Sequence, residues 1–106
     1  MKVTSINIGR DFNEYPVGRY RKDGDANGEK FREDFLKKPL QEGSVHVLLD
    51  DAFGYGSSFL EEAFGGLVRS GLTVKELEKT LVIVSDDESL KKEIWSYIKA
   101  AKKGDK

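Results

Sequence analysis

The segment of residues 45–71 constrains the fold more than any other part of this sequence. It opens with an almost continuous apolar run over residues 45–49, which is typical of a strand covered on both faces or at the centre of a sheet. Apolar residues then recur through residues 58–70 at the spacing of one helical face, and Gly71 should end that helix. A buried strand that leads into an amphipathic helix indicates an α/β protein.

Before this segment, two strands and a helix are predicted. Residues 3–8 carry β-branched residues in alternation, and residues 15–20 are interpreted as a short second strand. Charged residues and glycines make residues 10–28 a loop-rich insert around that strand. A helix is predicted over residues 29–38, where Pro39 should stop it.

After this segment, one turn of helix is predicted over residues 74–78 and a further buried strand over residues 80–84. The spacing of Ser85 and Glu88 predicts a capping box at the start of the last helix. Its inward-facing residues are Leu90, Ile94, Ile98 and Ala101. Residues 104–106 are expected to form a frayed end.

The order of elements is therefore β, β, α, β, α, β, α, which favours a mixed, mainly parallel sheet of about four strands with layered helices. The chain has 106 residues and 38% hydrophobic content, enough for one compact core and too little for two. We expect a single small α/β domain over residues 1–106.

Charge and composition exclude several classes of partner and site. The 18 basic and 19 acidic residues nearly balance, so nucleic acid and anionic membranes are not expected partners. There is no cysteine, and no apolar run reaches the roughly 18 residues of a membrane span. We expect a soluble, cytoplasmic protein without a cofactor. The neighbouring Asp50 and Asp51 would point to opposite faces of a strand, so a metal site is not expected there, and His46 is interpreted as a packed strand residue.

Two serines stand where the helix of residues 58–70 should begin. Ser58 and Glu61 have the spacing of a capping box, so Ser58→Ala should cost about 1 kcal/mol of stability. Ser57 lies one residue earlier, outside the capping bond, and its freer hydroxyl is expected near the ligand-binding edge of the sheet. Inside the same helix, Gly65 and Gly66 each cost about 1 kcal/mol relative to alanine, which predicts a close approach of another backbone.

Several stretches of this sequence match the pattern of one family. They are Val45-His46-Val47-Leu48-Leu49-Asp50, the run of residues 54–68 with both serines, Gly18-Arg19-Tyr20, Asp23-Gly24 and Gly28-Glu29-Lys30-Phe31-Arg32. On these residues, the chain resembles the STAS-like domain of unknown function, a relative of the bacterial anti-sigma-factor antagonists. The resemblance covers roughly residues 6–98.

The resemblance implies a regulatory role and a site. In antagonists of the STAS class, the second helix starts with Asp-Ser-Ser-Gly, and a serine or threonine there is phosphorylated by a partner of the histidine-kinase-like ATPase fold. Ser57 falls on that position and Ser58 just after it, although Gly56 replaces the aspartate. The implied function is a non-catalytic switch that binds a protein partner. The residues expected at that contact are Asp51, Tyr55, Gly56, Glu61, Glu62, Gly65 and Gly66.

Two other functions stay open. One is a small enzyme or ligand-binding domain with a pocket at the sheet edge, built from Asp50, Asp51, Ser57 and Arg10 or Arg19. No base is paired with Ser57 by spacing, which argues against it. The other is a structural subunit of a larger assembly. A further set of basic and aromatic residues is interpreted as a solvated face rather than a docking face: Arg19, Arg21, Lys22, Lys30 and Arg32, with Tyr15 and Tyr20. The oligomeric state is left open.

Overall fold

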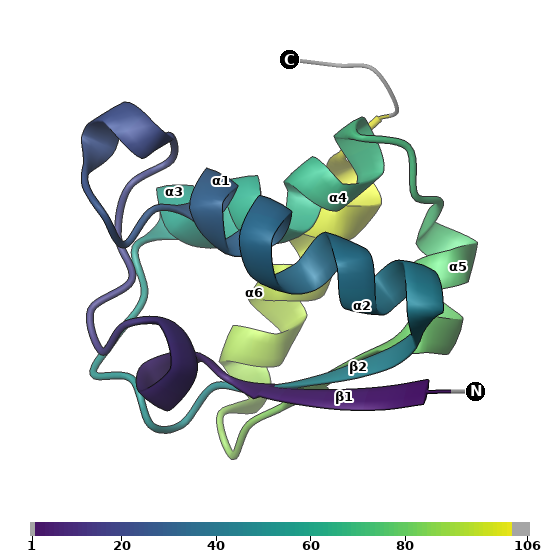
Figure 1. Cartoon of the computed structure of the whole chain (residues 1–106), viewed down its shortest axis with the longest axis horizontal. Coiled ribbons are helices and arrows are strands. Elements are labelled where there is room, and N and C mark those ends of the chain that lie inside the picture. Colours follow the sequence, from purple (N-terminus) through teal and green to yellow (C-terminus); the bar gives the residue numbers. More distant parts are fainter. Residues whose placement is uncertain (1, 103–106) are drawn as a thin grey trace.

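The computed structural model describes residues 2–102, and the predicted frayed end at residues 104–106 lies outside them. Within the described residues the sheet has three strands, β1 (Lys2–Asn7), β2 (Gly43–Leu48) and β3 (Leu81–Val84). Their order is β1-β2-β3 and both pairings are parallel (Figure 1). The α/β class is confirmed, and so is the central place of the second strand.

The predicted strand over residues 15–20 is a loop in the structure, so the expectation of about four strands was wrong. Pro16 has no N–H to offer a neighbouring strand, and Gly18 adopts a φ of 95°, which breaks an extended run. The loop is instead held by the Val17 N–H, which donates to the Ala26 carbonyl at 3.0 Å.

A long helix connects β1 to β2. The elements on this path are the π-helical turn η1 (Ile8–Phe12), the 3-10 turn η2 (Arg21–Asp23), α1 (Gly28–Phe31), the π-helical turn η3 (Arg32–Leu36) and α2 (Lys37–Glu42). The last three join into one helix, so Pro39 does not stop it as predicted. A π-helical turn ends at Leu36, three residues before the proline, with the Lys37 N–H bonded to the Arg32 carbonyl five residues back. The proline falls in the first turn of α2, where a missing N–H is tolerated.

A second long helix follows β2. The elements α3 (Ser57–Leu60), η4 (Glu61–Gly65) and α4 (Gly66–Arg69) are continuous. Gly71 has a φ of 124°, and the N–H of Leu72 bonds to the Leu67 carbonyl at 3.1 Å. This Schellman-type cap ends the helix where the sequence predicted.

Two further helices flank β3, namely α5 (Val74–Thr80) and α6 (Glu88–Ala100). The predicted capping box of Ser85 and Glu88 is wrong, because Asp87 caps α6 and accepts from the Leu90 N–H at 3.1 Å. The Ser85 hydroxyl donates to Asp50 at 2.6 Å instead, which ties the start of α6 to the end of β2.

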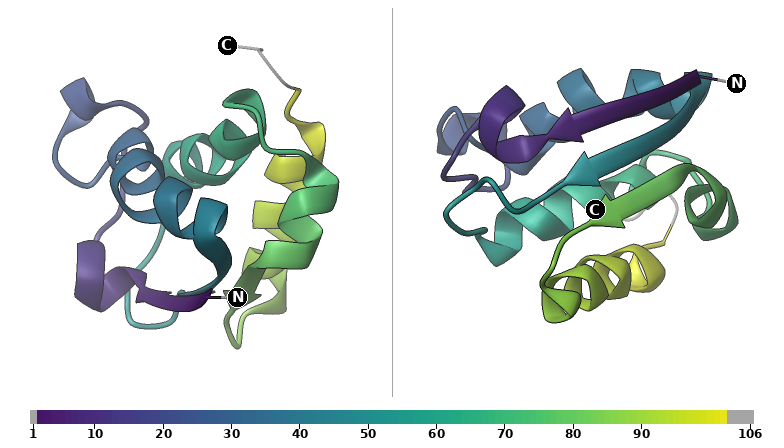
Figure 2. Two further views of the ribbon diagram at one scale, coloured as in Figure 1. Left: turned by 45° about the vertical axis from the view of Figure 1, so that its right-hand side comes forward. Right: turned by 90° about the horizontal axis from the view of Figure 1, so that it is seen from below.

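The helices pack on one face of the sheet and leave the other face open (Figures 1 and 2). Ile6, Val47 and Ile83 lie in register across the three strands on the helix-facing side. On the open side, Val82 and Val84 are each 42% exposed. The prediction that residues 80–84 form a buried strand therefore holds for one face only. In the described part of the chain, no helix has the length and apolar character to cross a membrane.

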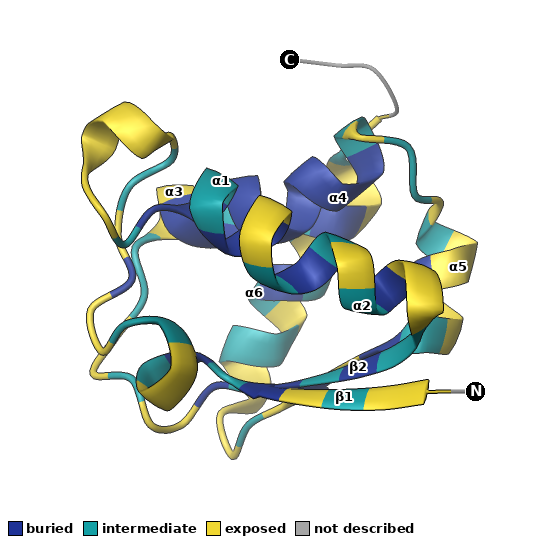
Figure 3. Ribbon diagram, viewed as in Figure 1, coloured by how far each residue is buried: buried dark blue, intermediate teal, exposed yellow. Residues whose placement is uncertain are grey.

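The helix of residues 57–69 is the most continuously buried helix, as Figure 3 shows. Its Phe59 and Phe64 pack against Phe31 of α1 with ring centroids 5.8 and 6.3 Å apart. Phe12 and Phe35 extend this aromatic cluster. The core thus fixes the helix firmly, and its first turn is positioned by that packing.

Candidate functional site

Ser57 and Ser58 occupy the first two positions of α3, and both side chains are exposed. The N-cap is Gly56, with extended backbone angles of −69° and 139° and no side chain to cap the helix. The predicted capping box of Ser58 and Glu61 is therefore wrong, because the helix starts one residue earlier than expected. Within the described residues, neither serine hydroxyl takes part in a hydrogen bond.

Two loops flank the start of α3 and are bonded to each other. The Phe53 N–H donates to the Glu14 carbonyl at 2.8 Å, and the Gly56 N–H donates to the Pro16 carbonyl at 3.1 Å. These bonds bring together two segments that are far apart in the sequence. The loop of residues 13–20 therefore lies beside the serines.

Exposed apolar side chains project from these two loops. Tyr15 and Phe53 stack with ring centroids 5.0 Å apart and an interplanar angle of 13°, although they are 63% and 71% exposed. Val17, 58% exposed, lies against Gly56. Large apolar side chains grouped on a surface are typical of protein-binding sites. We call this group, Tyr15, Val17, Phe53, Ser57 and Ser58, the α3-start surface.

Tyr55 belongs to the same loop but faces inward. Its hydroxyl donates to the Leu49 carbonyl at 2.6 Å, and burial raises the pKa of this phenol. The side chain anchors the 50–56 loop to the end of β2. Of the predicted contact residues in this loop, Asp51 is exposed, whereas Tyr55 and Gly56 are half-buried.

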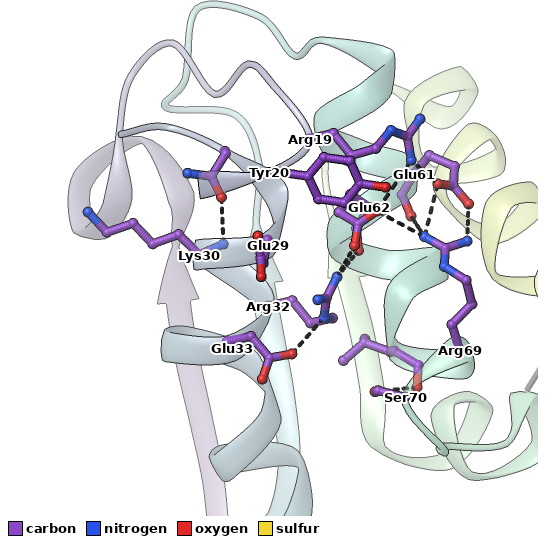
Figure 4. A network of polar contacts seen from close by, with 12 residues as sticks. Arg19, Tyr20, Glu29, Lys30, Arg32, Glu33, Glu61, Glu62, Arg69 and Ser70 are labelled. Atoms are coloured by element: carbon purple, nitrogen blue, oxygen red, sulfur yellow. Dashed lines mark hydrogen bonds and ion pairs between the residues drawn. The ribbon is translucent and has the colours of Figure 1, made fainter. Parts of the chain in front are cut away.

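Five charged residues form the arginine–glutamate cluster drawn in Figure 4. Its members are Arg19, Arg32, Arg69, Glu61 and Glu62. Glu62 is 7% exposed and binds Arg32 through Oε2 at 2.6 Å and Arg69 through Oε1 at 3.3 Å. Arg32 also donates to the Glu62 carbonyl at 2.7 Å. The cluster ties η3 and the loop that carries Arg19 to the helix of residues 57–69.

Glu61 binds Arg69 at 2.5 Å and also pairs with Arg19. Burial by itself raises the pKa of Glu61, but the hydrogen bonds and charges of Arg69 and Arg19 outweigh it and hold that pKa below its usual range. The same hydrogen bonds raise the pKa of both arginines. Glu61, Arg19 and Arg69 therefore stay charged near neutral pH.

The cluster changes the interpretation of several predicted residues. Arg19 and Arg32 were assigned to a solvated face, yet Arg32 is 9% exposed and Arg19 half-buried. Glu62, Gly65 and Gly66 are buried, so they do not lie on the surface where a partner contact was predicted. Among the helix residues predicted to contact a partner, Glu61 is half-buried and reaches solvent.

The two helix glycines make room for different neighbours. A Cβ at Gly65 would lie 3.3 Å from the Tyr97 carbonyl oxygen of α6, which confirms the predicted close approach of a backbone. A Cβ at Gly66 would collide with the Arg32 guanidinium. Gly66 thus provides the space in which the buried Arg32 reaches Glu62.

The residues proposed for an enzymatic pocket are engaged in separate contacts. Asp50 accepts from the Ser85 hydroxyl at 2.6 Å and from the Asp86 N–H at 2.8 Å, and these bonds lower its pKa. Asp51 accepts from Asn7 at 2.7 Å and lies 3.6 Å from Arg10. Arg19 belongs to the arginine–glutamate cluster. Among residues 2–102, no three His, Asp or Glu side chains are grouped to hold a metal ion.

Sequence reasoning missed two features of this site, the Tyr15–Phe53 stack and the role of Arg69. Tyr15 and Phe53 are separated by more than a strand and a helix, so no local pattern pairs them. Arg69 stands eight residues after Glu61, about two helical turns, which was a signal for a shared helix face.

The comparisons with known proteins agree with this architecture. The family described as a STAS-like domain of unknown function (DUF4325) matches residues 27–91, more than half of the chain. That range runs from the start of α1 into α6 and contains both serines and four of the five cluster residues. No match was found among curated proteins or solved structures. The chain belongs to the family of STAS-like domains of unknown function.

Proposed function

We propose that this chain is a non-catalytic regulatory domain that binds another protein through the α3-start surface. We further propose that phosphorylation of a serine at the start of α3, by a partner of the histidine-kinase-like ATPase fold, controls this binding. The observation that carries the proposal is the position of two exposed hydroxyls at the end of the loop that carries Phe53 of the exposed aromatic pair. Family membership supports the same function, since the related antagonists are modified at this helix start.

Electrostatics makes such a switch effective. A phosphate adds about −1.5 to −2 charges at pH 7. A partner that covers the aromatic pair and the serines would have to desolvate this charge. A tenfold loss of affinity corresponds to only about 1.4 kcal/mol, well below the cost of burying an unpaired charge.

The polar residues considered for an enzymatic pocket support catalysis less well than the α3-start surface supports binding. Asp50 and Asp51 are engaged in hydrogen bonds at the strand ends, and Arg19 is bound to glutamates. Ser57 has no base among these partners. We therefore favour binding over catalysis as the function of this surface.

The test is a calorimetric titration with the partner that copurifies from the native host. Ser57→Asp should keep the fold and weaken binding at least about tenfold, whereas Ser57→Ala should retain it. Ser89→Asp is a matched control, because it places the same charge in the first turn of α6, away from the α3-start surface.

Equal affinities for the wild-type, Ala and Asp forms at position 57, and likewise at position 58, would contradict the proposal. A structural subunit of a larger assembly would then be the better interpretation. A weakening by Ser89→Asp as large as that by Ser57→Asp would show a general effect of charge rather than a site. Mass spectrometry of the protein from the same host would identify which serine carries phosphate.

A further inference from the structure

The arginine–glutamate cluster carries one more positive than negative charge. Its ion pairs extend through Arg32 to Glu33 and from there to Lys37. Among the described residues joined in this way, four cations face three carboxylates: Arg19, Arg32, Arg69 and Lys37 against Glu33, Glu61 and Glu62. The network can therefore accept one further anion.

Arg19 is the arginine of the cluster that is best placed to bind it. Its side chain is 33% exposed, against 11% for Arg32 and 17% for Arg69. Arg32 is enclosed between η3 and η4, with its guanidinium on Glu62 (Figure 4). Arg19 comes from the loop beside α3, at the open end of the network. It can exchange partners without uncovering the core.

Helix geometry places Ser58 on the helix face of the two glutamates that bind Arg19. Nη1 of Arg19 contacts carboxylate oxygens of both Glu61 and Glu62, so the guanidinium lies between these two side chains. Successive residues of a helix are about 100° apart when viewed down its axis, so Ser58 projects nearly midway between Glu61 and Glu62. It lies one turn earlier along the helix. Helical side chains also lean toward the N-terminus, which brings both carboxylates toward the turn of Ser58. Ser57 points about 90° away from this direction.

We propose that Ser58 is the regulatory phosphorylation site and that Arg19 is the residue that binds the phosphate. This inference rests on the proposed function and assigns its switch to one serine. In the reaction, the Ser58 hydroxyl oxygen attacks the γ-phosphorus of a nucleoside triphosphate bound to the partner kinase. The new O–P bond forms as the bond to the β–γ bridging oxygen breaks. The nucleoside diphosphate leaves with that electron pair, and the hydroxyl proton passes to a base of the kinase.

The phosphate then competes with Glu61 and Glu62 for Arg19. Both glutamates keep a partner when Arg19 leaves, since Arg69 binds both of them and Arg32 binds Glu62. Arg19 belongs to the loop that carries Tyr15 and Val17, and its carbonyl accepts from the Glu29 N–H at 3.0 Å. A shift of Arg19 toward Ser58 would therefore move the loop side of the α3-start surface. This links the modification to partner binding.

The test compares two proteins that carry phosphoserine at position 58 or at position 57, the matched control. A ³¹P NMR titration measures the second pKa of each phosphate, which is about 6 without a neighbour. We expect the phosphate at position 58 to titrate at least about half a pH unit below the one at position 57, since a bound guanidinium favours the dianion. Arg19→Gln should abolish the difference, and Arg19→Lys should restore part of it.

Equal titration midpoints, or a difference that survives Arg19→Gln, would overturn the inference. If Arg19→Gln does not fold, Glu61→Gln provides the decision, because it removes a competitor for Arg19. It should lower the midpoint at position 58 further, and an unchanged midpoint there would count against Arg19. These outcomes are separable from the proposed function: partner binding that weakens with Ser57→Asp while both phosphates titrate alike would leave that function standing and this inference refuted.

Discussion

Ser57 and Ser58 begin a helix without capping it, because the N-cap position is taken by Gly56. We therefore expect Ser57→Ala and Ser58→Ala each to change the free energy of unfolding by less than about 0.5 kcal/mol, as for exposed residues without special contacts. Asp87→Ala is the control, since Asp87 caps α6 and its loss should cost about 1 kcal/mol. Urea unfolding of the three variants measures their free energies of unfolding. A cost at Ser58 equal to that at Asp87 would restore the capping role that the sequence predicted.

Glu62 has a different kind of position, nearly buried and surrounded by arginines. Glu62→Gln removes the buried negative charge that faces Arg32 and leaves that guanidinium with the more exposed Glu33 as its ionic partner, which should destabilise the protein by about 3 kcal/mol. Glu33→Gln removes a more exposed carboxylate from the same arginine and should cost less than about 1 kcal/mol. Chemical denaturation measures both. Equal costs would mean that burial of the pair does not determine its contribution.

At the scale of the element, Gly66 distinguishes local helix preference from tertiary packing. Helix propensity alone predicts that Gly66→Ala stabilises the protein by about 1 kcal/mol. A Cβ there would collide with Arg32, which is held by Glu62 and cannot withdraw without breaking that pair. We therefore expect a lower melting temperature for Gly66→Ala, and little change for Gly54→Ala, where no atom lies within 4 Å of the added Cβ. A gain in melting temperature at position 66 would show that Arg32 can move freely.

At the scale of the whole molecule, the carboxylates determine how stability depends on pH. The pKa of Asp50 is lowered chiefly by the Ser85 hydroxyl, and that of Glu61 is lowered by Arg69 and Arg19 against the effect of burial. A carboxyl group with a lowered pKa binds fewer protons when folded than when unfolded. The stabilisation that such a group contributes is fully present at pH values above its pKa in the unfolded chain. It is lost as the pH falls through its pKa in the folded protein.

We therefore expect a nearly constant melting temperature from pH 7 to about pH 5 and a decline below about pH 4. Glu61→Gln should flatten this decline, because it removes one of the groups that must take up a proton. Glu78→Gln, a substitution at an exposed position of α5, is the comparison. Calorimetric melting at several pH values measures the slopes. A melting temperature that rises on acidification would contradict the prediction.

The sequence by itself determined the features that depend on a few neighbouring residues. The apolar run of residues 45–49 indicated a central strand, and the helical spacing that follows it, closed by Gly71, predicted the second long helix. Such patterns are local, since a helix repeats every 3.6 residues and a strand every two. The family resemblance rested on the same segment and is confirmed by the match over residues 27–91.

Tertiary structure alone decided the number of strands, the length of the first helix and the contacts of the site. Residues 15–20 had the composition of a strand, but Pro16 and Gly18 keep them in a loop bonded to neighbours that only the folded chain provides. Glu61 had the spacing to cap a helix with Ser58, yet Arg19, 42 residues away, and Arg69 bind it instead. A half-buried carboxylate takes the partners that packing brings to it, because an arginine compensates its charge and the backbone N–H of a capping box does not. The partners of Glu61 come from segments that are distant in the sequence. The local pattern therefore predicted correctly that Glu61 makes polar contacts, but it named the wrong partner.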